Sequence, residues 1–491
     1  MNILLVYPKY PDTFWSFKHV LKFISKKSCM PPLGLLTIAS MLPDEWNKRL
    51  VDVNVSALND DDIEWADMVF ISAMIVQKEN AQAIINRCKA KARTVVAGGP
   101  VFTTQPDAFT GIDHFVLNEA EITLPMFIDD INKGSPRRTY SSNEKPDITK
   151  TPVPMWSLIN VMDYATMVVQ YSRGCPFNCE FCDIIVMNGR VPRTKSSIQL
   201  VNELNALYNT GWRDAVFIVD DNFIGNKANV KKMLPDMIKW QKKHDFPFKF
   251  TTEASTNLAD DSELLNMMSA ANFYKVFLGL ETPNIDSLNE CDKRQNSARD
   301  LAKVVRTIHS HGLQVMGGFI VGFDNDNEGI FEKQIKFIQD IGVVTAMVGV
   351  LTALPQTRLW HRLKAEGRII SETTANTDGA VNFIPKMGHK ALLDGYKNIM
   401  ATIYSPRNYF KRIETFVESY RPTVKNFISK EDLFAALKST WKIGIMSRAR
   451  FFYWRLLLRL SIRKRKAIPV AIELAVYWLH FDKVARALSH N

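Results

Sequence analysis

Three cysteines near the middle of the chain lie within eight residues of one another. Cys175, Cys179 and Cys182 follow a short apolar segment and have C-x3-C-x2-C spacing. Three thiolates at this spacing on one loop can bind three irons of a cubane 4Fe–4S cluster. No fourth cysteine or histidine lies in this segment, so the fourth iron stays open to a chelating small molecule. An open iron favours chemistry at the cluster over simple electron transfer.

Zinc is the competing metal for this loop. It binds four nitrogen or sulfur ligands, or three and a water, and usually at C-x2-C spacing, which makes it the weaker interpretation here. The other cysteines, Cys29, Cys88 and Cys291, are scattered, so no disulfide framework is indicated. The N-terminus has the pattern of a first strand, and no apolar run reaches about 18 residues. We therefore expect a cytoplasmic protein.

The elements that would position the cysteine loop form a βα series over residues 163–370. Its predicted strands are 167–171, 215–219, 249–252, 275–280, 314–320 and 346–351, separated by helical patterns. About six βα units predict an open, partial (β/α)6 barrel with its chemistry at the carboxyl ends of the strands. The cysteine loop follows the first of these strands.

The cysteine spacing, with an aromatic residue before the third cysteine and a strand before the loop, resembles the radical S-adenosylmethionine (SAM) superfamily. The resemblance implies that SAM chelates the open iron and is cleaved reductively to a 5′-deoxyadenosyl radical. An external donor of the flavodoxin or ferredoxin type would supply the electron. Further strand-end residues match elements of the family, and the resemblance implies SAM contacts from Phe181, Asp220, Asp221, Glu253, Glu281, Gly318, Ile320, Gly322 and Pro355.

The implied roles of these residues differ. Asp220 and Asp221 end the second strand, where the family binds the methionyl amine, and carboxylates suit an ammonium group. Glu281 and Glu253 would accept hydrogen bonds from ribose hydroxyls. Residues 318–322 resemble the G-x-I-x-G element, although Asn325 occupies the place of a glutamate in the fuller motif. Pro355 would lie beside the adenine.

Residues 1–140 alternate short apolar runs with helical patterns, which predicts a doubly wound, Rossmann-like parallel sheet. The predicted strands are 3–7, 50–54, 68–72, 94–97 and 114–117. Ligands of such sheets bind beyond the carboxyl ends of the strands, where Gly98 and Gly99 allow a close approach or simply make a turn. No G-x-G-x-x-G follows the first strand, so a nicotinamide dinucleotide is not expected.

A doubly wound domain directly before such a barrel resembles the cobalamin-binding class of the superfamily. The resemblance implies cobalamin contacts from Tyr10, Ser72, Met74, Val76, Gly98, Gly99, Pro100 and Val101. The D-x-H-x-x-G motif that gives cobalt a histidine is absent, and neither His19 nor His114 has that context, so the lower axial ligand is left open. Residues 14–19 and 30–35 also match this group. The aromatic segment 14–19 is expected either to cover the corrin face or to form a buried staple.

The rest of the chain divides by composition. Residues 141–162 are rich in Pro, Ser, Asn and Lys, which predicts a linker, and residues 371–491 are predicted to be a helical, basic C-terminal domain. The net charge of the chain is +11, but residues 401–491 alone hold 18 Lys and Arg against 6 Asp and Glu. The first 400 residues are close to neutral, so a uniformly basic nucleic-acid-binding protein is not expected.

The basic charge is densest in residues 448–466, where aromatic residues, leucines and cations recur at helical spacing. Such a helix can lie peripherally on the inner, anionic face of a membrane, or it can be a solvated or inter-domain helix. Nucleic acid is a weaker third partner, because known RNA-binding motifs are missing.

The resemblance extends over nearly the whole chain, since a subgroup that contains the hopanoid C-2 methylases shares the basic helical C-terminus. It implies a cobalamin-dependent radical C-methyltransferase that acts on an unactivated carbon of a small-molecule or lipid substrate. Two alternatives remain open at this point. The first is an enzyme with both cofactors that catalyses a rearrangement, cyclisation or C–C bond formation without methyl transfer. The second is a non-catalytic corrinoid or redox sensor.

Overall fold

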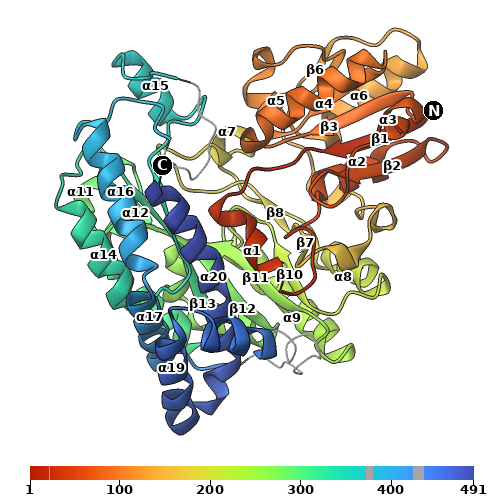
Figure 1. The fold of residues 1–491 in the computed structure, drawn as a ribbon. Coiled ribbons are helices and arrows are strands. Elements are labelled where there is room, and N and C mark those ends of the chain that lie inside the picture. Colours follow the sequence, from red (N-terminus) through yellow and green to blue (C-terminus); the bar gives the residue numbers. More distant parts are fainter. Residues whose placement is uncertain (22, 372–379, 424–435, 491) are drawn as a thin grey trace.

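The computed structural model describes residues 1–21, 23–371, 380–423 and 436–490. Figure 1 shows two sheets, each built of parallel strands, that lie one above the other, with a group of helices along one side of the second. This arrangement confirms the predicted α/β class with a helical C-terminal part. Parts of the predicted C-terminal domain, at 372–379 and 424–435, lie outside the described residues.

The first sheet has the strand order β2-β1-β3-β4-β5-β6, and every pair in it is parallel. Its strands are β1 Asn2–Tyr7, β2 Asn47–Asp52, β3 Met68–Ser72, β4 Thr94–Gly98, β5 His114–Val116 and β6 Thr139–Tyr140. The order reverses between β1 and β3, which is the switch point where doubly wound sheets bind their ligands. The second predicted strand is real but begins three residues earlier, and β6 was not predicted.

Helices cover both faces of this sheet, which explains why its strands are continuously apolar. The covering helices are α2 Leu33–Met41, α3 Asp60–Trp65, α4 Lys78–Ala90, α5 Pro100–Thr104 and α6 Ala120–Asn132. In β1 the four residues from Ile3 to Val6 are fully buried. Leu4 and Val6 pack into the core on one face, and Ile3 and Leu5 into the core on the other.

The second sheet is also parallel, in the order β14-β13-β12-β11-β10-β7. Its strands are β7 Met167–Val169, β10 Ala215–Ile218, β11 Lys249–Ala254, β12 Phe273–Glu281, β13 Gln314–Val321 and β14 Ala346–Val350. All six predicted strands are present, with ends that shift by a few residues. A short antiparallel pair, β8 Ser172–Arg173 with β9 Arg193–Thr194, flanks the cysteine loop and was not predicted.

Capping side chains start the helices that follow these strands. Helices of this part are α7 Ile184–Met187, α8 Ser197–Asn209, α9 Lys227–Lys243, α10 Ser262–Ala270, α11 Ile285–Glu290, α12 Arg294–Ser297, α13 Leu301–Ser310, α14 Ile330–Ile341 and α15 Arg358–Ala365. The caps that accept a backbone N–H three residues ahead are Ser196, Asn226, Asp261, Asp300 and Thr357. Each cap satisfies an otherwise unpaired amide of the first turn.

The segment 141–162, predicted as a linker, is packed between the sheets rather than extended. It carries the 3-10 helices Ile148–Lys150 and Trp156–Leu158, and a third, Val161–Asp163, overlaps its end. Ile148, Trp156 and Val161 are buried. Proline and serine signalled irregular backbone here, but the apolar side chains among them anchor that backbone to the core.

The C-terminal helices are α16 His389–Ile403, α17 Pro406–Ser419, α19 Arg450–Arg463 and α20 Ile468–His490, with a π-helix at Thr440–Ile445. Helix α20 runs beside α1 Lys18–Leu21, along the second sheet (Figure 1). Glu473 of α20 forms an ion pair with buried Lys275 of β12. In the described residues, no helix is long and apolar enough to span a membrane.

The aromatic segment 14–19 packs against α20. Phe14 stacks on Phe481 with ring centroids 4.5 Å apart, and Phe17 stacks on His480 at 5.4 Å. The ring of His480 also contacts the carbonyl oxygen of Phe14 through Nε2 at 3.0 Å. Of the two roles expected for this segment, Phe14 and Phe17 therefore take that of a buried staple.

Replacing Phe481 with alanine tests the importance of this staple. The side chain is fully buried against Phe14, so Phe481→Ala should lower the free energy of unfolding by about 3–5 kcal/mol. Urea unfolding followed by fluorescence measures the change. Phe451→Ala, at a side chain that is 69% exposed, is the matched control and should change stability by less than about 0.5 kcal/mol.

Candidate active site

The cysteine loop lies between β8 and α7, at the carboxyl end of the first strand of the second sheet. Gly174 begins it with φ +95°, and a Cβ there would lie 3.0 Å from the carbonyl oxygens of Gly189 and Val191. The backbone N–H of Cys175 donates to the Gly189 oxygen at 3.2 Å. Only glycine fits this turn without strain, and Cys175 follows it directly.

The thiols have neutral hydrogen-bond donors beside them. The amide of Asn222 lies 3.7 Å from Sγ of Cys175, and the amide of Gln295 lies 3.6 Å from Sγ of Cys179. Burial raises the pKa of Cys182 to about 12 when no iron is present, so metal binding must displace its proton. Among the described residues, no three Cys, His, Asp or Glu side chains converge on a single metal-ion position.

An arginine of α15 clamps the loop from the C-terminal side. The guanidinium of Arg362 binds both carboxylate oxygens of buried Glu180, at 2.7 and 3.0 Å. Arg362 and Arg368 both bind Asp324 beyond the end of β13. Burial opposes ionisation of Asp324, but hydrogen bonds from Arg368 and Arg362 hold its pKa at about 2. The loop is thus tied to the opposite side of the barrel.

A second set of ion pairs fastens the loop to the first sheet. Arg173, two residues before Cys175, binds Glu119 at 2.9 Å and Glu121 at 2.8 Å. Arg193 of β9 binds the other oxygen of Glu119 at 2.8 Å. Both glutamates lie at the start of α6, and all four side chains are at most 17% exposed. These pairs join the two sheets directly at the cysteine loop.

Asp220 lies beside the loop, but its oxygens are already occupied. One accepts the backbone N–H of Tyr171 at 2.7 Å, and the other accepts the hydroxyl of Ser172 at 2.6 Å. Burial raises the pKa of this carboxyl to about 7. Asp220 therefore holds the turn between β7 and β8. Its neighbour Asp221 accepts a hydrogen bond from the Asn188 amide at 3.0 Å and another from the backbone of Gly174.

The two predicted glutamates differ in their surroundings. Glu253 of β11 faces a large cavity, and burial together with the charge of Asp221 raises its pKa to about 8. Glu281 ends β12 in the left-handed region at φ +60° and binds Lys293 at 2.6 Å. Lys293 also lies 5.7 Å from the ring centre of Phe181, within the cysteine loop. The structure thus brings together Glu281, Phe181 and a cation.

The remaining predicted SAM contacts belong to the far strands. Gly318 and Ile320 lie on β13, and Pro355 lies in the turn before α15. The backbone N–H of Gly322 donates to Asp326 at 2.9 Å. Asp326 also accepts from Phe323 and Ser287, so it holds this turn next to Asn325, the position where the motif departs.

Lys293 was not anticipated from the sequence. Burial opposes its charge, but Glu281 and the nearby cysteines raise its pKa above the usual range. Its only sequence signal is a lysine in an otherwise polar segment, which is too common to single out. A buried cation facing three cysteines is a natural partner for a carboxylate ligand.

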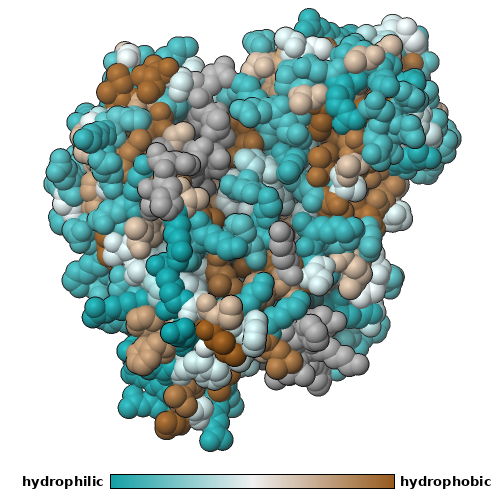
Figure 2. Space-filling model, viewed as in Figure 1, coloured by the Kyte–Doolittle hydropathy of each residue, from teal (hydrophilic) through white to brown (hydrophobic). Residues whose placement is uncertain are grey.

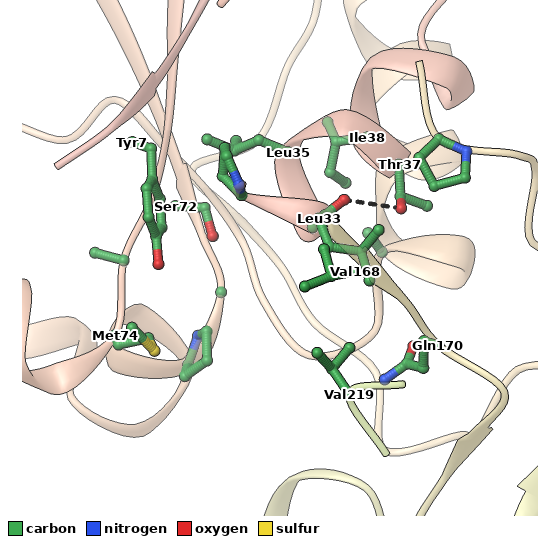
Figure 3. Close-up of a pocket in the computed structure, with 18 of the residues that line it drawn as sticks. Tyr7, Leu33, Leu35, Thr37, Ile38, Ser72, Met74, Val168, Gln170 and Val219 are labelled. Carbon is green, nitrogen blue, oxygen red and sulfur yellow. Dashed lines mark hydrogen bonds between the residues drawn. The ribbon is translucent and has the colours of Figure 1, made fainter. Parts of the chain in front are cut away.

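Between the two sheets lies a cavity of about 860 Å³. Figure 3 shows Tyr7, Ser72 and Met74 of the first sheet on one side of it, and Val168, Gln170 and Val219 of the second sheet facing them. Leu33, Leu35 and Ile38 of α2 close a third side. Its walls are mainly apolar, and its floor reaches the ion pairs of Arg173.

Seven of the eight predicted cobalamin contacts line this cavity, namely Tyr10, Ser72, Met74, Val76, Gly98, Gly99 and Pro100. Val101 does not, because its side chain is fully buried in the core of the first sheet. All six residues of segment 30–35 also line the cavity. Gly99 has φ +91°, and a Cβ there would lie 2.5 Å from the Ser72 hydroxyl. A side chain at position 99 would therefore clash with Ser72, and glycine keeps this part of the cavity wall free.

No histidine is among the described residues that line this cavity. His114 contacts the carbonyl oxygen of Arg137 at 2.7 Å through Nδ1, and His19 lies against His480 with ring centres 5.5 Å apart. The described walls therefore present apolar side chains and small polar groups to a corrin ring, and they present no imidazole.

Comparison with known proteins agrees with this geometry. Residues 23–128 match the B12 binding domain, residues 169–338 the radical SAM superfamily, and residues 357–491 a domain of unknown function. The uncharacterized methyltransferase sll1242 of Synechocystis sp. is 42% identical over 92% of this chain and 86% of its own length. The hopanoid C-2 methylase of Rhodopseudomonas palustris is 33% identical over 94% of this chain and 90% of its own length.

The chain belongs to the cobalamin-binding radical SAM family. It is a cobalamin-dependent radical SAM methyltransferase, and its cofactors are a 4Fe–4S cluster, SAM and cobalamin. The solved structure of OxsB, a cobalamin-dependent SAM radical enzyme with aqua-cobalamin and SAM bound, superposes with a TM-score of 0.64 at 14% identity. That match covers 100% of this chain and 80% of the other, and it shows the shared fold.

The shifted carboxyl of Glu253 makes stability depend on pH. Its pKa is about 8 in the fold against an ordinary 4.5, so the stability that its protonated form contributes is complete below 4.5 and is lost as the pH rises through 8. Glu253→Gln should therefore gain stability relative to the unmodified apoprotein as pH rises through this window. Urea unfolding at several pH values measures it. Glu79→Gln at an exposed site is the control, and a parallel trend there would contradict the prediction.

Removing the ion pair between Arg362 and Glu180 should weaken cluster binding without unfolding the protein. Arg362→Ala leaves the buried carboxylate of Glu180 unpaired, so the loop should retain several-fold less iron and sulfide after anaerobic reconstitution. Iron and sulfide analysis with the cluster's visible absorbance measures this. Arg87→Ala breaks an exposed pair with Asp60 and should retain the full complement.

Proposed function

We propose that this enzyme methylates an unactivated carbon of a hydrophobic, lipid-like substrate. The observation that carries the proposal is the apolar cavity between the sheets. One wall comes from the β1/β3 switch point, and the opposite wall comes from the strand ends beside the cysteine loop. A substrate there would meet both cofactor domains at once. The hopanoid C-2 methylase, whose name denotes a lipid substrate, supports the same class.

In this proposal Cys175, Cys179 and Cys182 bind the 4Fe–4S cluster. Asn222 and Gln295 donate hydrogen bonds toward two of the sulfurs. Lys293 binds the carboxylate of SAM, and Glu281 keeps that lysine charged and in place. Asp220 already accepts hydrogen bonds from the backbone of Tyr171 and the hydroxyl of Ser172, so we assign the methionyl amine to Asp221 and to backbone acceptors.

The residues that line the cavity bind cobalamin and exclude water in this proposal. Ser72, Gly98 and Gly99 hold cobalamin at the strand ends through close backbone contact. Tyr10, Met74, Val76 and Pro100 complete this wall, and Leu33, Val168 and Val219 keep water from the space between the cofactors. When bound, the cofactors supply hydrogen abstraction and the methyl group, whereas the protein orients the reactants and excludes solvent. An external donor of the flavodoxin or ferredoxin type supplies electrons.

The proposal predicts two products from one incubation. Anaerobically reconstituted enzyme with cobalamin, a reductant and SAM labelled in its methyl group, mixed with a hopanoid-containing lipid extract, should form 5′-deoxyadenosine and a labelled lipid. Liquid chromatography with mass spectrometry detects both. Replacing Cys175, Cys179 and Cys182 together with alanine should abolish 5′-deoxyadenosine formation, whereas Cys88→Ala, in the core of the first sheet, should retain it.

The outcomes separate the candidate reactions. Formation of 5′-deoxyadenosine with label in a water-soluble product would contradict the lipid substrate. Its formation with no labelled product at all from lipid or polar extracts would favour a reaction without methyl transfer. A cysteine variant that still forms 5′-deoxyadenosine would contradict the assignment of the cluster ligands.

A further inference from the structure

The surface of the C-terminal helices carries an apolar stripe that no described part of the chain covers. Phe451, Trp454, Leu458 and Ile462 of α19 are 69%, 44%, 63% and 82% exposed. Their spacing of three and four residues places them on one face of the helix. Trp441, Ile445 and Met446, in and just after the preceding π-helix, are also exposed. We call these seven residues the α19 face.

The α19 face is a different side of the helix from the one that packs into the core. Helix α19 already packs a different side against the protein, because Tyr453, Leu456 and Leu460 are at most 4% exposed. They belong to the core of the second sheet and its helices, and α19 contacts α17 and α20. The helix is thus apolar on two sides, and only one of them belongs to the core.

Positive charge borders the α19 face. Residues 433–472 contain ten Lys and Arg and no Asp or Glu. Arg455 and Arg459 pair with Glu414 of α17, and Arg448 pairs with Asp482 of α20. Arg450, Arg463 and Lys466 make no ion pair with any residue that the structure describes.

The position of the helix leaves this face accessible. Figure 1 places α19 at the lower end of the molecule, opposite the first sheet. Figure 2 shows brown, hydrophobic patches among teal surface at that end. The cavity between the sheets lies elsewhere, so the α19 face does not line the active site.

We propose that the α19 face docks on an anionic lipid bilayer. Exposed Phe, Trp, Leu and Ile on one side, with unpaired cations at the border, are what a helix needs to lie in the interface of a membrane. The apolar side chains enter the boundary between headgroups and acyl chains, and the cations stay with lipid phosphates. A nucleic acid would use the cations but would leave the aliphatic side chains in water, and a second copy of this chain would bring the same positive charge against it.

Vesicle flotation of the full-length protein tests this. Vesicles of equimolar phosphatidylcholine and phosphatidylglycerol should bind the protein, and vesicles of phosphatidylcholine alone should bind it far less. The variant Phe451→Gln, Leu458→Gln, Ile462→Gln should partition at least about tenfold less onto the anionic vesicles. Arg450→Gln, Arg463→Gln, Lys466→Gln should partition about 100-fold less, and binding should fall with added salt.

Matched controls remove equal numbers of similar side chains elsewhere. Met162→Gln, Ile198→Gln, Ile285→Gln replaces apolar residues that are 58–72% exposed away from α19. Lys232→Gln, Lys239→Gln, Lys333→Gln removes exposed charge from α9 and α14. Both controls should bind vesicles as the unmodified protein does, and circular dichroism should show that every variant is folded.

Three results would overturn the proposal. The first is vesicle binding that the α19 variants and their controls retain equally. The second is no binding to anionic vesicles but dimerisation in light scattering that the apolar variant abolishes, which would make the face a contact between copies. The third is binding to a single-stranded oligonucleotide, and not to vesicles, that is lost in the charge variant. None of these readouts involves catalysis, so they are separate from the test of methyl transfer.

Discussion

A buried group of ion pairs between Arg173, Arg193, Glu119 and Glu121 holds the two halves of the active site in one arrangement. Withdrawing four charges from water is costly, and the cost is offset only when every pair forms. Because Arg173 lies two residues before Cys175 and both glutamates begin α6, the pairs form only if the cysteine loop meets the first sheet. Arg173, Glu119 and Glu121 also line the cavity between the sheets, so these pairs fix its walls at the cysteine loop.

The same loop is fixed from its other end by Arg362, which binds Glu180 within the loop and Asp324 beyond β13. The three cysteines thus lie between a clamp from the N-terminal part and a clamp from the C-terminal part. Such pre-organisation suits chemistry in which a reactive species must meet its target before it meets water. The protein contributes position and dryness, and the cofactors contribute the reaction.

The C-terminal helices divide into two roles. Helix α20 is structural, since Glu473 neutralises Lys275 of the second sheet and Phe481 stacks on Phe14. Helix α19 packs on α20 and α17 but presents a second apolar side to the outside, and its Arg450 and Arg463 make no ion pair with any described residue. Helix α19 thus faces outward on one side, while its neighbour α20 completes the core.

Local patterns in the sequence determined the class of fold, the strands of both βα series except β6, and the cysteine loop with its cluster, because these depend on residue types at short spacing. SAM and cobalamin followed from the resemblance of these motifs to a known family. The roles of single side chains depended on partners far along the chain. Asp220 was predicted to contact an amine, and the structure shows that its oxygens also accept hydrogen bonds from Tyr171 and Ser172. Val101 follows a ligand-binding turn, but α5 directs it into the core. Lys293, the staple of Phe14 and the ion pairs of Arg173 are likewise products of long-range packing, which no local spacing encodes.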